Sequence, residues 1–283
     1  MNEPALLTRF VQTYPAQPAT AYWRAVEIDA LAQAGIPQGL GLDLGCGDGK
    51  LTDILLSLTG PRDLVGIDPD ALETAAAAKY PFYKRLHTCF GNAIPEPDAS
   101  FDFVISNSVL EHIPELEPTI AEAGRLLKPG GRFYFTVPQP AFHDNLAGAF
   151  LGLRQRDDYL KRLDKRIAHF NYLDTAAWTE LCGRHGLVVE QCRGYLDKRQ
   201  TRRWESLSRM TGGLLYALVG ERMRPIEIQR AMGARDLQNK NSTPQPVAAA
   251  LAGMISVGAP IVEGDPWRAP ETASCLLVEG SRA

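Results

Sequence analysis

Three closely spaced glycines preceded by an acid form the stretch of this sequence best suited to hold a ligand. The glycines lie at positions 45, 47 and 49, and Asp43 comes two residues before the first of them. Glycine allows positive φ and leaves no Cβ in the way of a ligand. Exposed N–H groups at the start of a following helix favour negative or electron-rich atoms. The stretch therefore predicts a cradle for an anion or a cofactor between a strand and a helix.

The glycine spacing argues against two common phosphate-binding loops. A dinucleotide fingerprint, G-x-G-x-x-G, would need its third glycine at position 50, which is Lys50. A phosphate loop, G-x-x-x-x-G-K-[ST], would need glycine at position 44 and serine or threonine at position 51, and both are leucine. The Asp43 carboxylate could instead face an ammonium group, which favours a ligand with an amino acid end.

A second acid, Asp68, follows a short apolar run at 64–67 that is typical of a buried strand. It comes about 20 residues after the glycine turn, where an acid in a βαβ unit can accept both hydroxyls of a ribose. The two acids together predict a ligand with an amino acid end and a nucleoside end.

Five motifs follow one another between about residues 40 and 138, at 42–49, 65–69, 91–93, 101–112 and 126–133. Together they resemble the class I S-adenosylmethionine-dependent methyltransferases of the broad type-11 kind. One departure is Asn92, where many relatives carry aspartate. An amide can still accept a hydrogen bond from the adenine amine.

The resemblance implies a role for each matching residue. It places Asp43, Gly45, Cys46 and Gly47 around the methionine part, Asp68 and Pro69 at the ribose, Asn92 and Ala93 against the adenine, and Asn107 and Ser108 at the lip facing methionine and acceptor.

The pattern of apolar runs predicts an α/β fold. Seven strands are expected, at 40–44, 64–67, 86–90, 101–106, 132–137, 187–195 and 274–279. Helices at 51–58, 71–79 and 116–127 separate the first strands, and a helix from the N-cap Thr20 to about residue 34 precedes them. This alternation predicts a Rossmann-like, doubly wound, mostly parallel sheet, and the resemblance implies that the last strand is antiparallel.

Four parts are expected along the chain. They are an N-terminal helical cover at 1–40, the methyltransferase core at 41–196, a helical insertion at 197–270 that should set substrate specificity, and the final strand at 271–283. Residues 193–235 carry ten Lys or Arg against four Asp or Glu, and 214–219 and 247–262 are apolar. The apolar stretches predict buried helices or, alternatively, a basic and apolar surface that contacts a membrane or a lipid phosphate.

Composition limits the partners and the compartment. A net charge of -3 gives no general signal for nucleic acid, and the basic segment lacks the interleaved aromatic residues of a single-strand groove. The five cysteines show no C-x-x-C pairing, and the first residues do not resemble a secretory signal. We expect a cytoplasmic protein with reduced thiols, and no metal, because no cluster along the sequence has metal-ligand spacing.

Methyl transfer requires alignment of two reactants and, for a hydroxyl or amine acceptor, a base. The candidate bases are His143, which follows the fifth strand, and His169, which follows an amphipathic helix expected over 153–167. Glu111 next to His112 suggests an acid–base pair, but neighbouring helical positions should point apart.

Three functions remain open on the sequence. The first is methylation of a small molecule, most simply at an oxygen of a sugar, a lipid-linked precursor or a secondary metabolite. The second is a nicotinamide-dependent oxidoreductase, against which the glycine spacing and Asp43 argue. The third is a subunit that binds S-adenosylmethionine without a catalytic activity of its own.

Overall fold

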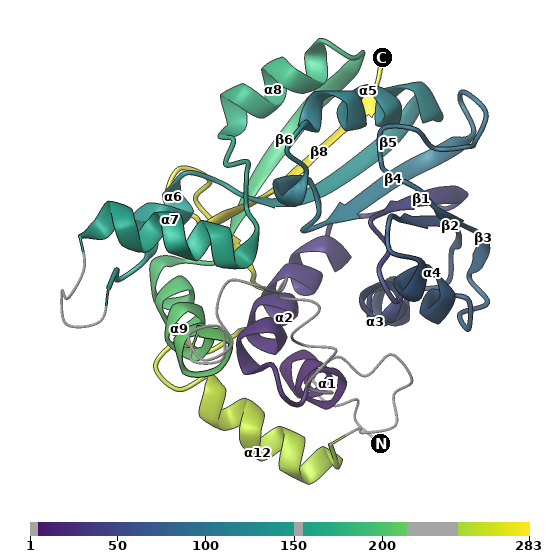
Figure 1. Cartoon of the computed structure of the whole chain (residues 1–283). Helices are drawn as coiled ribbons and strands as arrows, with labels where there is room; N and C mark the ends of the chain where they lie inside the picture. The colour runs from purple at the N-terminus through teal and green to yellow at the C-terminus, as the bar shows by residue number, and fades with distance from the viewer. Residues whose placement is uncertain (1–4, 150–154, 214–242) are drawn as a thin grey trace.

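The computed structural model describes residues 5–149, 155–213 and 243–283. Within these ranges it shows one eight-stranded sheet in the order β3-β2-β1-β4-β5-β8-β6-β7 (Figure 1). The strands are β1 (Leu40–Leu44), β2 (Asp63–Asp68), β3 (Tyr83–Thr88), β4 (Phe101–Asn107), β5 (Leu127–Pro138), β6 (Leu187–Tyr195), β7 (Trp267–Arg268) and β8 (Cys275–Arg282). Strands β1 to β5 pair in parallel, and β8 is antiparallel to both β5 and β6.

Helices cover both faces of the sheet (Figure 1). They are α1 (Leu6–Thr13), α2 (Pro18–Ala32), α3 (Lys50–Thr59), α4 (Ala71–Ala77), the 3₁₀ turn η1 (Leu110–His112), α5 (Leu116–Leu126), α6 (Ala141–Asn145), α7 (Arg156–Ile167), α8 (Thr175–Gly183), α9 (Lys198–Ser208), the π-helical turn η3 (Arg209–Gly213) and α12 (Gln245–Ile255). The chain order and the parallel pairing confirm the doubly wound α/β fold with an antiparallel last strand.

The central strand β4 shows why the sheet needs cover on both sides. Phe103 and Ile105 point into one apolar core, which they share with α1, α2 and α3. Val104 points into the other, which is closed by α5 and α8. Since side chains alternate along a strand, a run of apolar residues buries one set on each face. The predicted central strand is therefore confirmed.

The order of the strands reverses between β1 and β4, because β2 and β3 lie on one side of β1 while β4 and β5 lie on the other. In open α/β sheets ligands bind outside the carboxyl ends of the strands at such a switch point. The glycine turn follows β1, Asn107 is the last residue of β4, and Ser108 comes directly after it. The fold thus brings two of the predicted motifs to the same sheet edge.

Several predicted boundaries shift. The third strand spans Tyr83–Thr88 rather than 86–90, because it is an edge strand with mostly exposed or half-buried side chains and no continuous apolar run. Helix α2 begins at Pro18 rather than after Thr20, since proline at the first helical position has its φ preset for a helix. The seven predicted strands are joined by an eighth, the two-residue β7, which pairs with β6.

The segment expected as a helical insertion contains the helices α9 and α12 in its described part, but residues 267–268 form the strand β7, which was not predicted. The predicted apolar stretch 214–219 lies outside the described residues. Helix α12 buries Ala248, Ala252 and Ile255 and leaves Val247 and Met254 exposed, so only one of its faces is covered. No helix in the described ranges is long and apolar enough to cross a bilayer.

Candidate active site

The glycine turn after β1 has the backbone that its sequence predicted. Gly45, Gly47 and Gly49 have φ angles of 82°, 53° and 77°, in the left-handed region that favours glycine. A Cβ on Gly45 would lie 2.3 Å from a methyl group of Val109, the residue after Ser108. The turn therefore packs directly against the end of β4.

Asp43 lies beneath this turn and is 3% exposed. Its Oδ2 accepts hydrogen bonds from the hydroxyls of Thr52 and Tyr83, each at 2.6 Å. Burial raises the pKa of Asp43 to about 6, although the two hydroxyls favour its charged form. Oδ2 therefore already accepts two hydrogen bonds from side chains of the protein. The predicted contact between the Asp43 carboxylate and an ammonium group stays a prediction, and Oδ1 is the oxygen that we expect to make this contact.

Asp68 links the end of β2 to the glycine turn. Its Oδ2 accepts the N–H of Gly47 at 3.1 Å, and its Oδ1 accepts the N–H of Asp70 at 2.9 Å. The backbone N–H groups of Gly45 and Cys46 donate to the carbonyl of Ile67 at 2.9 and 2.8 Å. The acid predicted for the ribose is therefore held beside the glycines predicted for the methionine.

The other predicted cofactor residues lie around the same sheet edge. Pro69 is exposed after β2, and Asn92 and Ala93 are exposed in the loop between β3 and β4. Phe90, which is 72% exposed, belongs to the same loop and was missed by the sequence analysis. The signal available in the sequence was an aromatic residue two positions before Asn92, since a flat ring can stack on a base.

Asn107 and Ser108 are positioned by Glu27, a carboxylate of α2 with 0% exposure. The Ser108 hydroxyl donates to Glu27, and Thr136 on β5 donates to Glu27 Oε1 at 3.0 Å. With the Asn107 amide nitrogen turned toward α2, it donates to the same carboxylate at 2.9 and 3.0 Å. Arg24 forms an ion pair with Glu27. The sequence analysis missed Glu27, because an acidic residue on a predicted helix is expected to face solvent.

The two candidate bases come together across α6 and the end of α7. His143 Nε2 lies 2.9 Å from Asp164 Oδ1, and the Tyr172 hydroxyl lies 2.6 Å from the same oxygen. His169 Nδ1 lies 3.1 Å from the Tyr172 hydroxyl. Burial lowers the pKa of His169 well below its usual range, so this ring is neutral. The structure thus connects the two predicted histidines through Asp164 and Tyr172.

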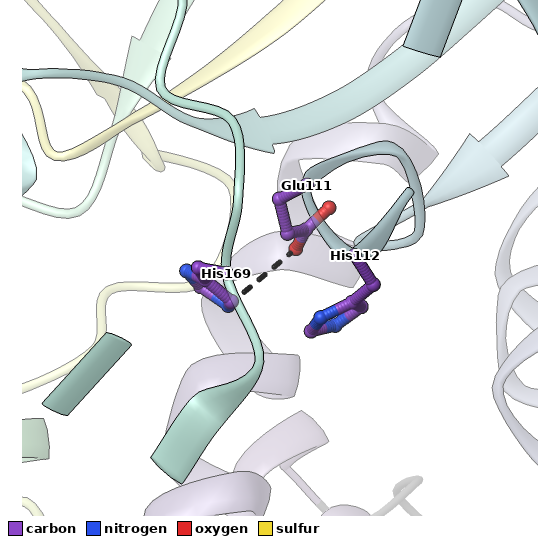
Figure 2. Close-up of side chains that lie close together, drawn as sticks. All are labelled: Glu111, His112 and His169. Carbon is purple, nitrogen blue, oxygen red and sulfur yellow. Dashed lines mark ion pairs between the residues drawn. The ribbon is translucent and has the colours of Figure 1, made fainter. Parts of the chain in front are cut away.

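Glu111 and His112 both approach His169 (Figure 2). Glu111 Oε1 lies 4.0 Å from His169 Nε2, and the rings of His112 and His169 are 5.0 Å apart. Glu111 and His112 were expected to point apart, and this expectation is wrong. Both belong to a 3₁₀ turn, and a polar atom of each side chain lies within 4.8 Å of one on His169. The sequence predicted no metal site, because His169, the third side chain with a possible ligand atom, lies more than 50 residues after Glu111 and His112.

The geometry of the sheet edge fits S-adenosylmethionine. It combines a positive-φ glycine turn, the start of α3 and an acid at the end of β2, which are groups suited to an amino acid and a ribose. The residues predicted for the cofactor lie in the last positions of β1, β2 and β4 or in the segments that follow β1 to β4.

Comparisons with known proteins agree with this fit. A family model described as "Methyltransferase domain" matches residues 21–192, more than half of the chain. A protein of Mycolicibacterium smegmatis, described as a "Probable S-adenosylmethionine-dependent methyltransferase", is 35% identical over 100 residues, covering 34% of this chain and 37% of that protein. The match thus spans only about a third of that relative's length.

Two further similarities extend over more of the chain. Malonyl-[acyl-carrier protein] O-methyltransferase of Hahella chejuensis is 27% identical over 199 residues, covering 62% of this chain and 70% of that protein. The solved structure of a SAM-dependent methyltransferase from Thermotoga maritima, described as a possible histamine N-methyltransferase, has a TM-score of 0.55 at 17% identity, covering 98% of this chain and 99% of that chain. The family model, together with a fold that agrees over nearly the whole length, shows that this chain belongs to the class I S-adenosylmethionine-dependent methyltransferases.

Proposed function

We propose that the protein transfers a methyl group from S-adenosylmethionine to an oxygen atom of a small-molecule acceptor. The sulfonium group of the cofactor supplies an electrophilic methyl, so the protein has to align the acceptor and take its proton. The observation that carries the proposal is the 2.9 Å contact between His143 and Asp164, which provides an oriented imidazole just after β5. The O-methyltransferase of Hahella chejuensis supports an oxygen as the methylated atom.

His143 suits the role of base better than His169. A carboxylate accepts the Nε2–H of His143, which leaves the lone pair on Nδ1 to take a proton, and the same arrangement orients histidine in hydrolytic triads. His169 is more buried and contacts Tyr172 and Glu111 through its two nitrogens. We therefore assign proton removal to His143 and positioning to Asp164.

For the cofactor we propose the contacts that the resemblance implied. The backbone of Gly45, Cys46 and Gly47 would hold the methionine part, and Asp68 with Pro69 would hold the ribose. Asn92 and Ala93 would contact the adenine. Two observations support this assignment, namely the hydrogen bond from the Gly47 N–H to Asp68 and the exposure of both loop residues.

Asn107 and Ser108 would lie between the methionine part and the acceptor. Their fixation by Glu27 supports this role, because a rigid segment at the reacting centre holds both reactants in line.

The surface of α9 and α12 favours a lipid-like acceptor or a peripheral membrane contact. Lys198, Arg199 and Arg202 on α9 are exposed, and so are Val247 and Met254 on α12. The two helices are neighbours, since a guanidinium of α9 donates to the carbonyls at the end of α12. Basic and apolar side chains side by side are what an anionic lipid headgroup and its chain require.

Calorimetry and methyl transfer test the proposed function separately. We expect S-adenosylmethionine and S-adenosylhomocysteine to bind, and Asp68→Ala to weaken both. Radiolabelled S-adenosylmethionine, incubated with a panel of sugars, prenylated phenols and long-chain carboxylic acids, should label at least one acceptor at oxygen. His143→Ala should then lower kcat by about 10²–10⁴-fold while cofactor affinity stays unchanged.

The control is His185→Ala, which alters a histidine paired with Glu117 at 3.1 Å, far along the sheet from α6. It should leave kcat unchanged. Cofactor binding without transfer to any acceptor would instead indicate a binding subunit without activity. Absence of cofactor binding would contradict the proposal as a whole.

A further inference from the structure

Three groups with metal-binding atoms meet beside the 3₁₀ turn that follows β4. Glu111 and His112 belong to this turn, and His169 comes from the segment after α7 (Figure 2). One ligand atom from each lies within 4.8 Å of the others. We propose that Glu111, His112 and His169 bind a divalent transition-metal ion, with Zn²⁺ as the ion that suits the site best.

The carboxylate of Glu111 is the first reason. Glu111 is 1% exposed, and neither of its oxygens has a hydrogen-bond partner among the described residues. Arg24 on α2, whose charge acts on Glu111, already forms an ion pair with Glu27. A buried carboxylate without a partner is strongly destabilising, and a bound cation supplies the missing interaction.

The hydrogen bonds of the two imidazoles are the second reason. His112 Nδ1 lies 2.9 Å from the carbonyl oxygen of Ala168, and a carbonyl can only accept, so Nδ1 carries the proton. The Tyr172 hydroxyl gives its proton to Asp164, so its oxygen accepts from His169 Nδ1. Both rings therefore have their lone pair on Nε2, the atom by which His169 approaches Glu111. Metal-binding histidines are oriented by such outer hydrogen bonds.

The backbone around the three groups is fixed as well. The N–H of Phe170 donates to the Glu111 carbonyl at 2.7 Å. The Asn171 side chain donates to the carbonyls of Leu110 and Ile113 at 3.2 and 2.6 Å. These bonds tie the segment that carries His169 to the turn that carries the other two ligands. The site is thus formed by the fold itself.

The type of ligand decides the type of metal. Two imidazole nitrogens and one carboxylate suit Zn²⁺ and its transition-metal neighbours, whereas Mg²⁺ and Ca²⁺ prefer a shell of oxygens. Three protein ligands leave a fourth tetrahedral position for water or an acceptor oxygen. Since His112 is exposed, the ion can reach the site from solvent.

Metal binding can be measured directly on the whole chain, without any methyl transfer. Protein stripped with a chelator would be titrated with Zn²⁺ by calorimetry and with Co²⁺ by visible absorption. We expect one high-affinity ion per chain and the d–d bands of four-coordinate Co²⁺, with Mg²⁺ unable to compete. Glu111→Gln, which keeps the shape of the side chain, should abolish the Co²⁺ bands. Tyr172→Phe should weaken Zn²⁺ binding by roughly 10–100-fold.

The surface pair His185 and Glu117, 3.1 Å apart, is the matched control. Glu117→Gln should leave Zn²⁺ affinity unchanged. Binding of S-adenosylhomocysteine reports that each variant is folded. Equal Zn²⁺ affinity in the wild type and in Glu111→Gln would overturn the proposal, and so would absence of the Co²⁺ bands in the wild type.

Discussion

Replacement of Asp43 by asparagine should change how the stability of the protein depends on pH. Asp43 is almost fully buried, and burial raises its pKa from 3.8 to about 6. Between these two values the folded chain keeps a proton on Asp43 that the unfolded chain has lost. Because the folded state binds more protons, the free energy of unfolding falls as pH rises through this window.

The size of the effect follows from the pKa difference. A shift of about two pH units corresponds to roughly 3 kcal/mol, of which about 2 kcal/mol falls between pH 4 and pH 7. Asp43→Asn does not titrate, so it should gain this amount relative to the wild type over that range. Urea unfolding of both proteins at several pH values measures it, and curves that stay parallel would refute the reasoning.

Two further variants sharpen this test. Tyr83→Phe removes a hydrogen bond that favours the ionised form of Asp43, so the transition should move to higher pH. Glu271→Gln, which changes an exposed carboxylate far along the sequence from Asp43, is the control. If Asp43 also faces the ammonium of the cofactor, binding should release a proton below about pH 6. Calorimetry in buffers of different ionisation enthalpy detects that proton, and Asp43→Asn should abolish it.

Three other outcomes follow from the contacts around the site. Gly45→Ala should destabilise the fold by at least about 1–2 kcal/mol and prevent cofactor binding, because φ at Gly45 is 82° and the new Cβ would meet Val109. When Val109→Ala is added to Gly45→Ala, urea unfolding should show that only part of the stability is restored. Glu27→Gln should lower the free energy of unfolding by roughly 3 kcal/mol, since it removes the buried charge that pairs with the half-buried Arg24; urea unfolding measures this loss. The double change Val247→Ser and Met254→Ser should reduce sedimentation with anionic vesicles without altering cofactor affinity, whereas unchanged sedimentation would contradict a membrane contact through α12.

The sheet was predictable because its central strands are buried on both faces. Phe103, Val104 and Ile105 form an apolar run in the middle of β4, which indicates a buried strand at this position. The edge strand β3 was misplaced because its exposed side chains carry no such run. The two-residue β7 could not be predicted, since it exists only by pairing with β6.

The cofactor turn was predictable for a different reason. Positive φ at Gly45, Gly47 and Gly49 is a local requirement of the backbone, and only glycine meets it without strain. The contacts of Asp43 were not predictable, because Tyr83 reaches it from β3, two strands away in the sheet. Long-range contacts of this kind depend on the register of the strands, which the spacing along one chain does not give.

The segment from Asn107 to His112 shows most clearly why spacing alone missed a candidate site. Ser108 has a φ of 49°, so the chain turns sharply where β4 ends, and η1 then turns it again. Ser108 therefore donates a hydrogen bond to Glu27 on α2, a residue that precedes this segment in the sequence. Glu111, three residues later, faces His169, which follows the segment in the sequence. One short stretch thus supplies the proposed cofactor site and the proposed metal site. Because each is completed by a residue distant in sequence, only the folded chain reveals that the two sites are neighbours.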